Sequence, residues 1–505
     1  MSSNDERVDT PTASGTHDHD LQDREVKKDP ESPLDVSEPE PHSIYTSTEK
    51  WAIVALIGFG GLFSPLSSNI YFPVIPTLSE VFHKSIELIN LTVTMYIVFQ
   101  GLAPMFWGTL ADSYGRRLMF ICCLLLLSVS CVGLALVPTN AYWLLLFLRC
   151  FQSAGSARVV FFGVYNIGPL VGPAVGPVLG GALGDHLGWR SIFWFLCIAS
   201  AACALTLILF LPETLRSLVG NGSIPPPTIS RPVIPLFGRG ARARSTGTAP
   251  PTRKRKPFQN PLRLLFNPDI LILLTFNGLI CAVFYGVNTS IATVLHETYP
   301  TLSETELGLC YIAIGGGMLL GSVISGKLLD WDYQRVKRGM SLLSFKCGED
   351  PDQTATAEEG DAFPIEKARM RLVPVLVACF VASCVAYGWC IERGVNLAGP
   401  LVFLVGVGIF TMAIMNSAQT LILDLVPSQG SSVTACNNLV RCALSAAMVA
   451  VIQLILDALG AGWTYVLLAG LCVVASPLIW VVIRIGPGCR AKRKRVQEGS
   501  GGARV

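Results

Sequence analysis

The stretch GPLVGPAVGPVLGG, residues 168–181, has a glycine at every fourth position, and a proline follows three of these glycines. In a soluble protein such a stretch is typical of turns, because proline lacks an N–H group and obstructs the preceding helical turn. Here it continues an apolar run long enough to cross a bilayer, which favours a helix. Four residues advance a helix by about 400°, so the glycines stay on one face. We expect that face to pack closely on another helix, with Gly317 and Gly321 as the partner surface.

The composition indicates that lipid is the main solvent of this chain. Of its 505 residues, 51% are hydrophobic and 14% are charged, whereas soluble domains carry about 25% charged residues. Runs of about 20 apolar residues match a hydrocarbon core of about 30 Å. Twelve such runs occur, at 51–73, 88–107, 118–137, 141–157, 159–184, 189–211, 270–293, 307–325, 372–391, 397–423, 432–456 and 463–485. This pattern predicts an all-α polytopic membrane protein.

The twelve runs fall into two groups of six. We expect pseudo-symmetric six-helix bundles at 51–212 and 269–485, joined by a cytoplasmic connector at 213–268 that is rich in Pro and Arg. Residues 1–50 predict a disordered tail, and residues 486–505 predict a basic tail. The clusters of Lys and Arg share one side of the membrane when the N-terminus is inside, so the positive-inside rule places both termini in the cytoplasm.

Two similar segments indicate that the halves repeat one another. WGTLADSYGRR at 107–117 follows the second run, and SGKLLDWDYQR at 325–335 follows the eighth run. Repeated halves around a central site are typical of alternating-access transporters.

The first of these segments contains a loop signature formed by Gly108, Asp112, Gly115, Arg116 and Arg117. It resembles the signature that the major facilitator superfamily carries between its second and third spans. The glycines permit a tight turn. Asp112 and the arginines would then form a conformation-dependent ionic latch with neighbouring helix ends. The resemblance implies the twelve-helix major facilitator fold.

The fourth run contains LRCFQSAG, residues 148–155, which resembles the superfamily's span-four motif in its Arg149, Gln152 and Gly155. A charged group deep in an apolar run is expensive, so Arg149 should face the bundle interior. The resemblance implies a role in proton transfer or in coupling to the substrate site. The alternative is that Arg149 simply pairs between helices.

The opening stretch resembles the span-five signature of drug–proton antiporters, in Gly168, Gly172, Pro173, Gly176, Pro177, Gly180 and Gly181. Further segments narrow the resemblance to the fungal quinidine-resistance-like branch of the twelve-span drug–proton antiporter-1 family: GWRSIFWF at 188–195, LPETLRSLVGNGSIPP at 211–226 and NNLVRC at 437–442. This resemblance implies export of drugs, weak acids, polyamines or related metabolites from the plasma membrane, with protons as the coupling ion.

One departure from the family pattern concerns the proton. NIYFPVIP at 69–76 begins with Asn69, whereas similar bacterial exporters carry an acidic residue there. The span interiors contain no deep carboxylate that could replace it. The candidates for carrying or coupling the proton are therefore Asp112, Asp424 and Arg149 with Arg441. A second interpretation is therefore a proton-independent facilitator.

A second departure concerns the length of the fourth span. Only twelve residues separate Gly155 from Gly168, yet the chain from Ala141 to Gly184 must cross the membrane twice, which needs about 40 helical residues. Either the fourth span is short and ends near Ala157, or the turn lies within the membrane. We expect a missing segment and poor transport or inefficient folding. A third interpretation, which follows from this shortened region, is a non-transporting sensor or an inactive copy.

Several polar side chains in the spans are candidates for a central cavity. Exporter cavities combine apolar walls with a few polar groups that fix the ligand. The candidates are Asn69, Tyr71, Tyr96, Gln100, Asn166, Asn277, Asn288, Asn416, Gln419, Asn438 and Arg441. The alternative for each residue is a hydrogen bond between helices.

Taken together, the motifs favour a secondary active exporter of drugs or amphipathic organic metabolites or ions, driven by proton exchange. Its partners would be a small-molecule substrate, protons and the lipid bilayer. No Walker A, H-E-x-x-H or G-x-S-x-G motif occurs. We therefore expect no enzymatic activity, no catalytic residue, no cofactor, no metal and no nucleic acid. We expect a monomer in a fungal plasma membrane.

Overall fold

The computed structural model describes residues 44–156, 167–220, 224, 227–237, 261–346, 365–426 and 430–501. The regular structure of these residues is helical, as the sequence predicts. Most of the expected N-terminal tail, half of the connector, and Asn166 lie outside the described residues.

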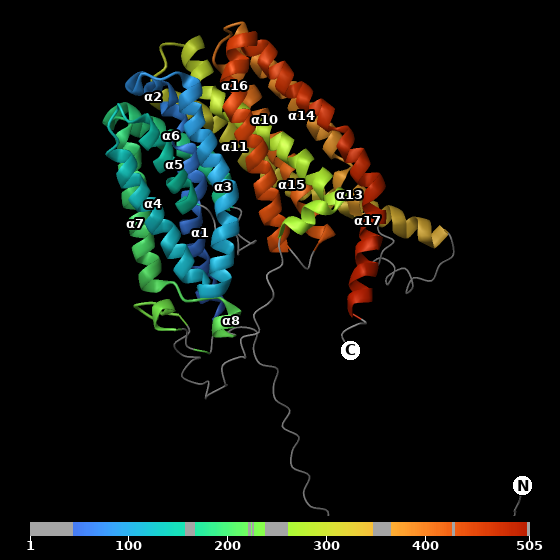
Figure 1. The fold of residues 1–505 in the computed structure, drawn as a ribbon. Helices are drawn as coiled ribbons and strands as arrows, with labels where there is room; N and C mark the ends of the chain where they lie inside the picture. Colours follow the sequence, from blue (N-terminus) through green and yellow to red (C-terminus); the bar gives the residue numbers. More distant parts are fainter. Residues whose placement is uncertain are drawn as a thin grey trace, which may run out of the picture. The chain divides into compact units, whose positions relative to one another are not determined.

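The first half of the chain forms one group of helices, drawn from blue to green in Figure 1. The helix α1 begins at a capping box, in which Thr46 and Glu49 satisfy each other's backbone N–H groups. The elements of this half are α1 (Ser47–Asn69), η1 (Phe72–Val74), α2 (Ile75–Phe82), α3 (Ile86–Tyr114), α4 (Arg116–Ala135), α5 (Tyr142–Ser156), α6 (Ile167–Leu187) and α7 (Arg190–Phe210).

The second half forms the group drawn from yellow to red. The described residues of the connector include three short elements, α8 (Arg216–Val219), η2 (Thr228–Ser230) and η3 (Pro261–Phe266). The helices that follow are α10 (Pro268–Thr298), α11 (Glu304–Lys346), α13 (Ile365–Met370), α14 (Val373–Glu392), α15 (Ala398–Leu425), α16 (Gly430–Ala475) and α17 (Pro477–Gly501). The helix α17 continues past residue 485, where we expected the C-terminal tail to begin.

The helix α16 contains two helical segments. Its backbone leaves the helical region at Gly460, where φ is 74°. The Thr464 hydroxyl donates to the carbonyl of Ile455 at 3.2 Å, although nine residues of straight helix would span about 13.5 Å. The chain therefore folds back at Gly460, which separates the eleventh and twelfth apolar runs of the sequence.

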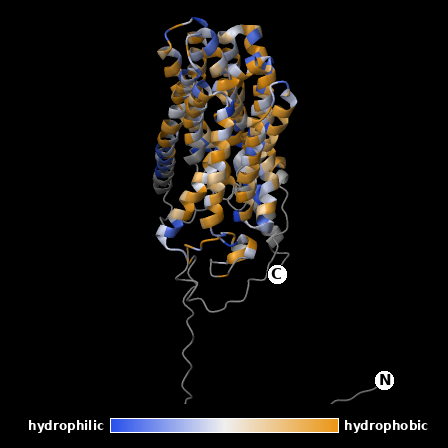
Figure 2. Cartoon of the chain, turned by 90° about the vertical axis from the view of Figure 1, so that its left-hand side faces the viewer, coloured by the Kyte–Doolittle hydropathy of each residue, from blue (hydrophilic) through white to orange (hydrophobic). Residues whose placement is uncertain are grey.

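The helices suit a lipid environment. Nine helices in the described part of the chain are long and apolar enough to cross a membrane, and one of the nine, Ser432–Arg493, includes both segments of α16. Hydrophobic residues extend along most of the helices in Figure 2. Large apolar side chains such as Trp143 (74% exposed) and Val474 (76% exposed) lie on the surface, where lipid would cover them. The chain is an integral membrane protein.

The fourth apolar run forms a helix. The described part of α5 has 15 residues, Tyr142–Ser156, which account for about 22 Å of a hydrocarbon core of about 30 Å. Residues 157–166, on which the expectation of a short span or a turn within the membrane depends, lie outside the described residues.

The opening stretch is helical, as predicted, and α6 packs against α1. A Cβ atom at Gly172 would overlap the ring of Pro65, and one at Gly176 would lie 3.0 Å from the Cβ atom of Asn69. Each glycine thus lets the two backbones approach more closely than any other residue would allow.

A second face of α6 packs against α11 of the other half. A Cβ atom at Gly308 would lie 2.5 Å from the carbonyl oxygen of Pro177. The predicted partner residues are wrong, because Gly317 and Gly321 pack instead against the backbone of α15, where Gly317 meets Val405. The helix α6 therefore lies between an N-terminal and a C-terminal helix, and each partner contacts a different set of small residues.

Candidate functional site

Arg149 on α5 is enclosed by two tyrosine rings. Its side chain is 1% exposed. The guanidinium carbon lies 4.0 Å from the centre of the Tyr71 ring, which follows α1, and 4.5 Å from the Tyr96 ring on α3. Its Nη1 atom donates to Gln152 Oε1 at 2.6 Å, one helical turn along α5. The structure thus brings four of the predicted residues into one buried cluster, which we call the Arg149 site.

The charge of Arg149 is incompletely compensated. No carboxylate pairs with it among the residues that the structure describes, and its Nε and Nη2 atoms are buried without a hydrogen-bond partner. Cation–π contacts contribute about 2 kcal/mol when desolvated, whereas an effective penalty of several kcal/mol applies to each buried ion. An anion placed beside these two N–H groups would complete the site.

The tyrosine rings are held in place by hydrogen bonds of their hydroxyl groups. The Tyr71 hydroxyl lies 3.0 Å from the Thr92 hydroxyl. The Tyr96 hydroxyl lies 2.7 Å from Ser67 Oγ and 2.6 Å from Ser156 Oγ. Because the hydroxyls are engaged at the ring edges, the ring faces stay turned toward the guanidinium.

A second, partly buried arginine lies on the other half of the molecule. Arg441 on α16 donates from Nη2 to Asn438 Oδ1 at 2.9 Å, and Asn438 Nδ2 donates to the carbonyl oxygen of Gln100 on α3 at 3.0 Å. The Nε atom of Arg441 has no partner. Gln100 follows Tyr96 by four residues, so the two arginine clusters contact successive turns of α3.

Close packing brings these two helices together. A Cβ atom at Gly101 of α3 would lie 2.8 Å from the Cβ atom of Cys442 on α16. Gly155 has the same role at the end of α5, since a Cβ atom there would lie 2.9 Å from the carbonyl oxygen of Cys123 on α4.

Other predicted cavity residues form hydrogen bonds between helices. Asn277 on α10 donates to Asn437 on α16 at 2.9 Å, and Asn437 donates to Gln419 on α15 at 2.7 Å. Asn416 contacts a different neighbour, Ser325 on α11, at 2.8 Å. These contacts agree with the alternative interpretation of the polar residues, namely that they form hydrogen bonds between helices.

Asn69 also joins helices. Its amide nitrogen donates to the carbonyl oxygen of Pro65 at 2.7 Å, and its oxygen accepts from Asn288 on α10 at 3.5 Å. Asn69 therefore ties α1 to the second half at the position where similar exporters carry an acidic residue.

The loop signature forms a turn closed by a carboxylate. Gly115 connects α3 to α4 with φ at 111°, and a Cβ atom there would lie 2.5 Å from an oxygen of Glu213. Glu213 is 1% exposed and accepts from the backbone N–H groups of Arg116 (3.1 Å) and Arg117 (3.2 Å). It thereby caps the N-terminus of α4, where the helix dipole favours a negative charge.

The side chains of this signature extend in different directions. Arg117 donates to the carbonyl oxygens of Ile208 at 2.7 Å and Ile229 at 3.3 Å. Asp112 is exposed near the end of α3, and a Cβ atom at Gly108 would meet open space.

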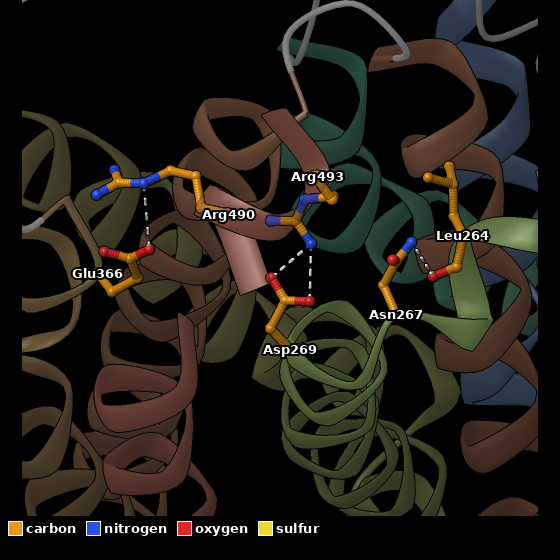
Figure 3. Close-up of polar contacts among 6 residues, drawn as sticks. All are labelled: Leu264, Asn267, Asp269, Glu366, Arg490 and Arg493. Carbon is orange, nitrogen blue, oxygen red and sulfur yellow. Dashed lines mark hydrogen bonds and ion pairs between the residues drawn. The ribbon is translucent and has the colours of Figure 1, made fainter. Parts of the chain in front are cut away.

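Among the described residues, three ion pairs join helices of the second half at the end where the connector enters, which we call the connector end. Arg493 on α17 donates from Nη1 to both oxygens of Asp269 at 2.7 Å, and Asp269 is fully buried in the first turn of α10. Arg490 lies 4.0 Å from Glu366 on α13 (Figure 3).

The third pair joins α13 to α15. Arg369 donates from Nε to Asp424 at 3.0 Å. Asp424, one of the carboxylates that the sequence offered for the proton, therefore belongs to this structural network.

Sequence reasoning missed several of these acidic residues. Glu213, Asp269 and Glu366 are close to span ends, where charged residues are common and carry no distinctive signal. Glu304 at the start of α11 was not considered for the same reason. One signal could have identified Asp269. Proline is common at the first position of a helix and an acidic residue is favoured in the first turn, so Pro268 followed by Asp269 is typical of a helix start.

Comparison with known proteins agrees with this geometry. The chain matches the model of the Major Facilitator Superfamily over residues 57–347. Citrate exporter 1 of Aspergillus niger is 34% identical over 481 residues, which cover 91% of this chain and 90% of that protein. The MFS antiporter QDR2 of Candida albicans is 33% identical over 466 residues, which cover 88% of this chain and 90% of that protein.

A solved structure has a similar fold. A bacterial homologue of the human lysosomal transporter Spinster, in an inward-facing and unoccupied conformation, aligns with a TM-score of 0.58 and 14% identity, covering 88% of this chain and 98% of that chain. Since the family model covers more than half of the sequence and the relatives match nearly all of it, the chain belongs to the Major Facilitator Superfamily, in its fungal quinidine-resistance-like branch.

Proposed function

We propose that this transporter is a secondary active exporter that moves organic anions across the plasma membrane in exchange for protons. The observation that carries the proposal is the Arg149 site, where a buried guanidinium keeps two N–H groups without a partner. A carboxylate is the ligand that a guanidinium binds best, because two parallel N–H···O bonds match its geometry.

The charge and shape of the site favour this substrate class. Arg149 and Arg441 both lack a carboxylate partner among the described residues, so a cationic ligand would meet two positive charges. The rings of Tyr71 and Tyr96 offer apolar surface to the rest of an amphipathic molecule. The relatives include a citrate exporter and a multidrug transporter, so their names refer to a carboxylate and to drugs.

The proposed mechanism is alternating access between two halves. In this proposal the chain crosses the membrane twelve times as a monomer with two pseudo-symmetric bundles and cytoplasmic termini. The helix α6, with its glycine faces on α1 and α11, provides a surface along which the halves shift. The signature in α6 supports antiport, because this segment distinguishes drug–proton antiporters from other members of the superfamily.

Two alternatives each rest on one observation. Asn69 cannot carry a proton, which favours a proton-independent facilitator. The separation of only twelve residues between Gly155 and Gly168 favours a copy that transports poorly.

Flux measurements in proteoliposomes separate these possibilities. The full chain is reconstituted, an acidic lumen is imposed, and uptake of radiolabelled citrate is followed with and without a protonophore. We expect accumulation above equilibrium that the protonophore abolishes. If citrate only equilibrates across the membrane, independently of the pH gradient, the result would support the facilitator. Absence of flux for citrate and for drug-like anions would overturn the proposal.

A variant pair links the flux to the site. Arg149→Gln should reduce uptake about tenfold or more, since a lost charged contact of about 1.4 kcal/mol corresponds to that factor. Arg393→Gln is the matched control, because Arg393 stacks on Trp389 at an exposed position. Equal loss in both variants would contradict a specific role for Arg149.

A further inference from the structure

The two halves meet through the first turn of α11. Glu304 is the first residue of this helix, and its Oε1 atom accepts a hydrogen bond from the hydroxyl of Thr77 on α2. Its neighbour Thr305 donates to Asp185 of α6 at 2.7 Å. We call this meeting point the α2 seam, and it lies at the end opposite the connector.

The carboxyl group of Glu304 lies directly against the glycines of α6. A Cβ atom at Gly184 would overlap Glu304 Oε2, and one at Gly181 would overlap the Glu304 backbone. Space for this carboxyl group therefore exists only because the signature continues with small residues. Ring stacking between Phe72 and Tyr311, with centres 6.2 Å apart, adds a second contact across the seam.

The surroundings do not supply a countercharge at hydrogen-bond distance. Oε2 of Glu304 is buried without a partner. The charged groups that act on it are Glu80 of α2, Asp185 of α6 and His296 of α10, and Glu306 follows on its own helix. Two of the three neighbours from other elements are acidic.

Closing the seam therefore takes one oxygen of a half-buried carboxyl group out of water, with acidic side chains nearby. A buried unpaired charge is costly, and a proton removes the charge. When the seam opens, water reaches the carboxyl group and the ionised form is stabilised again. Closure and proton binding must then favour one another, because each changes the free energy of the other by the same amount.

We propose that Glu304 is a proton-dependent gate of the α2 seam: a proton from the solution on that side binds Oε2, the seam closes, and the proton returns to the same solution when the seam opens. The inference rests on the alternating access of the proposed function and adds the group through which external pH acts on it. In the proposed orientation the seam faces the exterior, so external acid favours the conformation that loads substrate from the cytoplasm.

Hydrogen–deuterium exchange of the full chain in lipid nanodiscs tests the gate without any substrate. The amides of segments 75–84 and 300–307 are followed at about pH 5 and about pH 7.5, with the intrinsic exchange rates corrected for pH. We expect about tenfold stronger protection at the lower pH, since one protonated group changes an equilibrium by up to tenfold for each pH unit. Absence of this difference in the wild-type chain would overturn the proposal.

Two variants assign the effect to Glu304. Glu304→Gln should keep both segments protected at both pH values, because a neutral amide replaces the titrating group. Glu306→Gln is the matched control and should keep the wild-type response, since Glu306 is exposed and its carboxylate accepts from its own helix start at Ser303. A wild-type pH response in Glu304→Gln would overturn the assignment.

A third variant tests the gate without changing Glu304, so misfolding of a Glu304 variant does not decide the result. Citrate flux then distinguishes the gate from the proposed antiport. Thr77→Val removes the donor across the seam, so it should weaken protection at both pH values and keep the pH difference; loss of the difference in Thr77→Val would contradict the gate. Absence of citrate flux together with an intact pH response would refute the proposed antiport and leave the gate standing.

Discussion

Arginines in two regions of this transporter are surrounded in different ways, and Arg149 is almost fully buried whereas Arg493 and Arg369 are partly buried. At the connector end, Arg493 binds both oxygens of a fully buried Asp269, and Arg369 binds Asp424. In the Arg149 site the guanidinium meets two aromatic rings and a glutamine oxygen. The first kind of arginine has a carboxylate partner from another helix, whereas the second has no carboxylate partner among the described residues.

This difference indicates two roles for buried positive charge. An ion pair between helices makes their relative position part of the fold, because removing one partner leaves an uncompensated buried charge. An arginine without such a partner contributes little to stability and retains binding capacity for an anion that arrives from elsewhere. We therefore expect neutral substitution to lower the stability at the connector end and to leave the stability of the ligand-free protein unchanged at the Arg149 site.

The largest expected effect is the loss of a paired carboxylate. Asp269→Ala leaves the partly buried Arg493 without its carboxylate partner, so the free energy of unfolding should fall by about 3 kcal/mol. Thermal unfolding in nanodiscs measures this change. The double variant Asp269→Leu with Arg493→Met should recover most of the loss, because apolar side chains of similar volume replace the pair. If Asp269→Ala is as stable as the wild type, the ion pairs of the connector end do not stabilise the fold, which would contradict the proposed difference between the two regions.

The next effect concerns the Arg149 site in the presence of a ligand. Citrate at 100 times its dissociation constant should stabilise the wild-type protein by about 2.7 kcal/mol. Arg149→Met should abolish this stabilisation while leaving the ligand-free protein as stable as the wild type. A large loss of stability without ligand would show that Arg149 is a structural residue like Arg493.

A smaller effect is expected where α1 is held against α6, since Tyr71 follows directly after α1. Gly172→Ala places a methyl group where the ring of Pro65 lies, and overpacking costs about 1–3 kcal/mol. The displaced α1 should carry Tyr71 away from Arg149 and reduce citrate flux. Gly108→Ala is the matched control, because a Cβ atom there meets open space. Equal flux in the two variants would contradict this dependence.

The smallest effect concerns a ring hydroxyl. Tyr71→Phe removes the hydrogen bond to Thr92 and keeps the ring face over Arg149, so stability should fall by about 1 kcal/mol. Citrate affinity, measured by ligand-induced stabilisation, should change little. A loss of affinity as large as that of Arg149→Met would mean that the hydroxyl, and not the ring face, contributes to binding.

Much of the fold could be predicted from local sequence. The helical class, the positions of most apolar helices and the helical state of residues 168–181 follow from runs of apolar residues with bilayer length. The prediction that Gly317 and Gly321 face this helix was wrong, because the sequence pattern gives the small face of α6 without giving its partner. Both α6 and α11 have small residues on more than one face, and packing selected Gly308 over the predicted pair.

The candidate site was predictable only in part. The sequence identified Arg149, Gln152, Tyr71 and Tyr96 as separate candidates from motif and position. That they form one cluster depends on contacts across α1, α3 and α5, which no local pattern specifies. Asn416 and Gln419 shared a predicted face, yet they contact different helices.

By itself, the sequence determined that this protein is a helical membrane transporter of the Major Facilitator Superfamily, because hydrophobicity over about 20 residues and short loop motifs are local properties. Only the tertiary structure decided which charged groups are paired and which are left available. Thr77 and Glu304 are 227 residues apart, and Asp269 and Arg493 are 224 residues apart. Such contacts arise from the packing of whole helices, so their consequences for binding and gating become visible only in the folded chain.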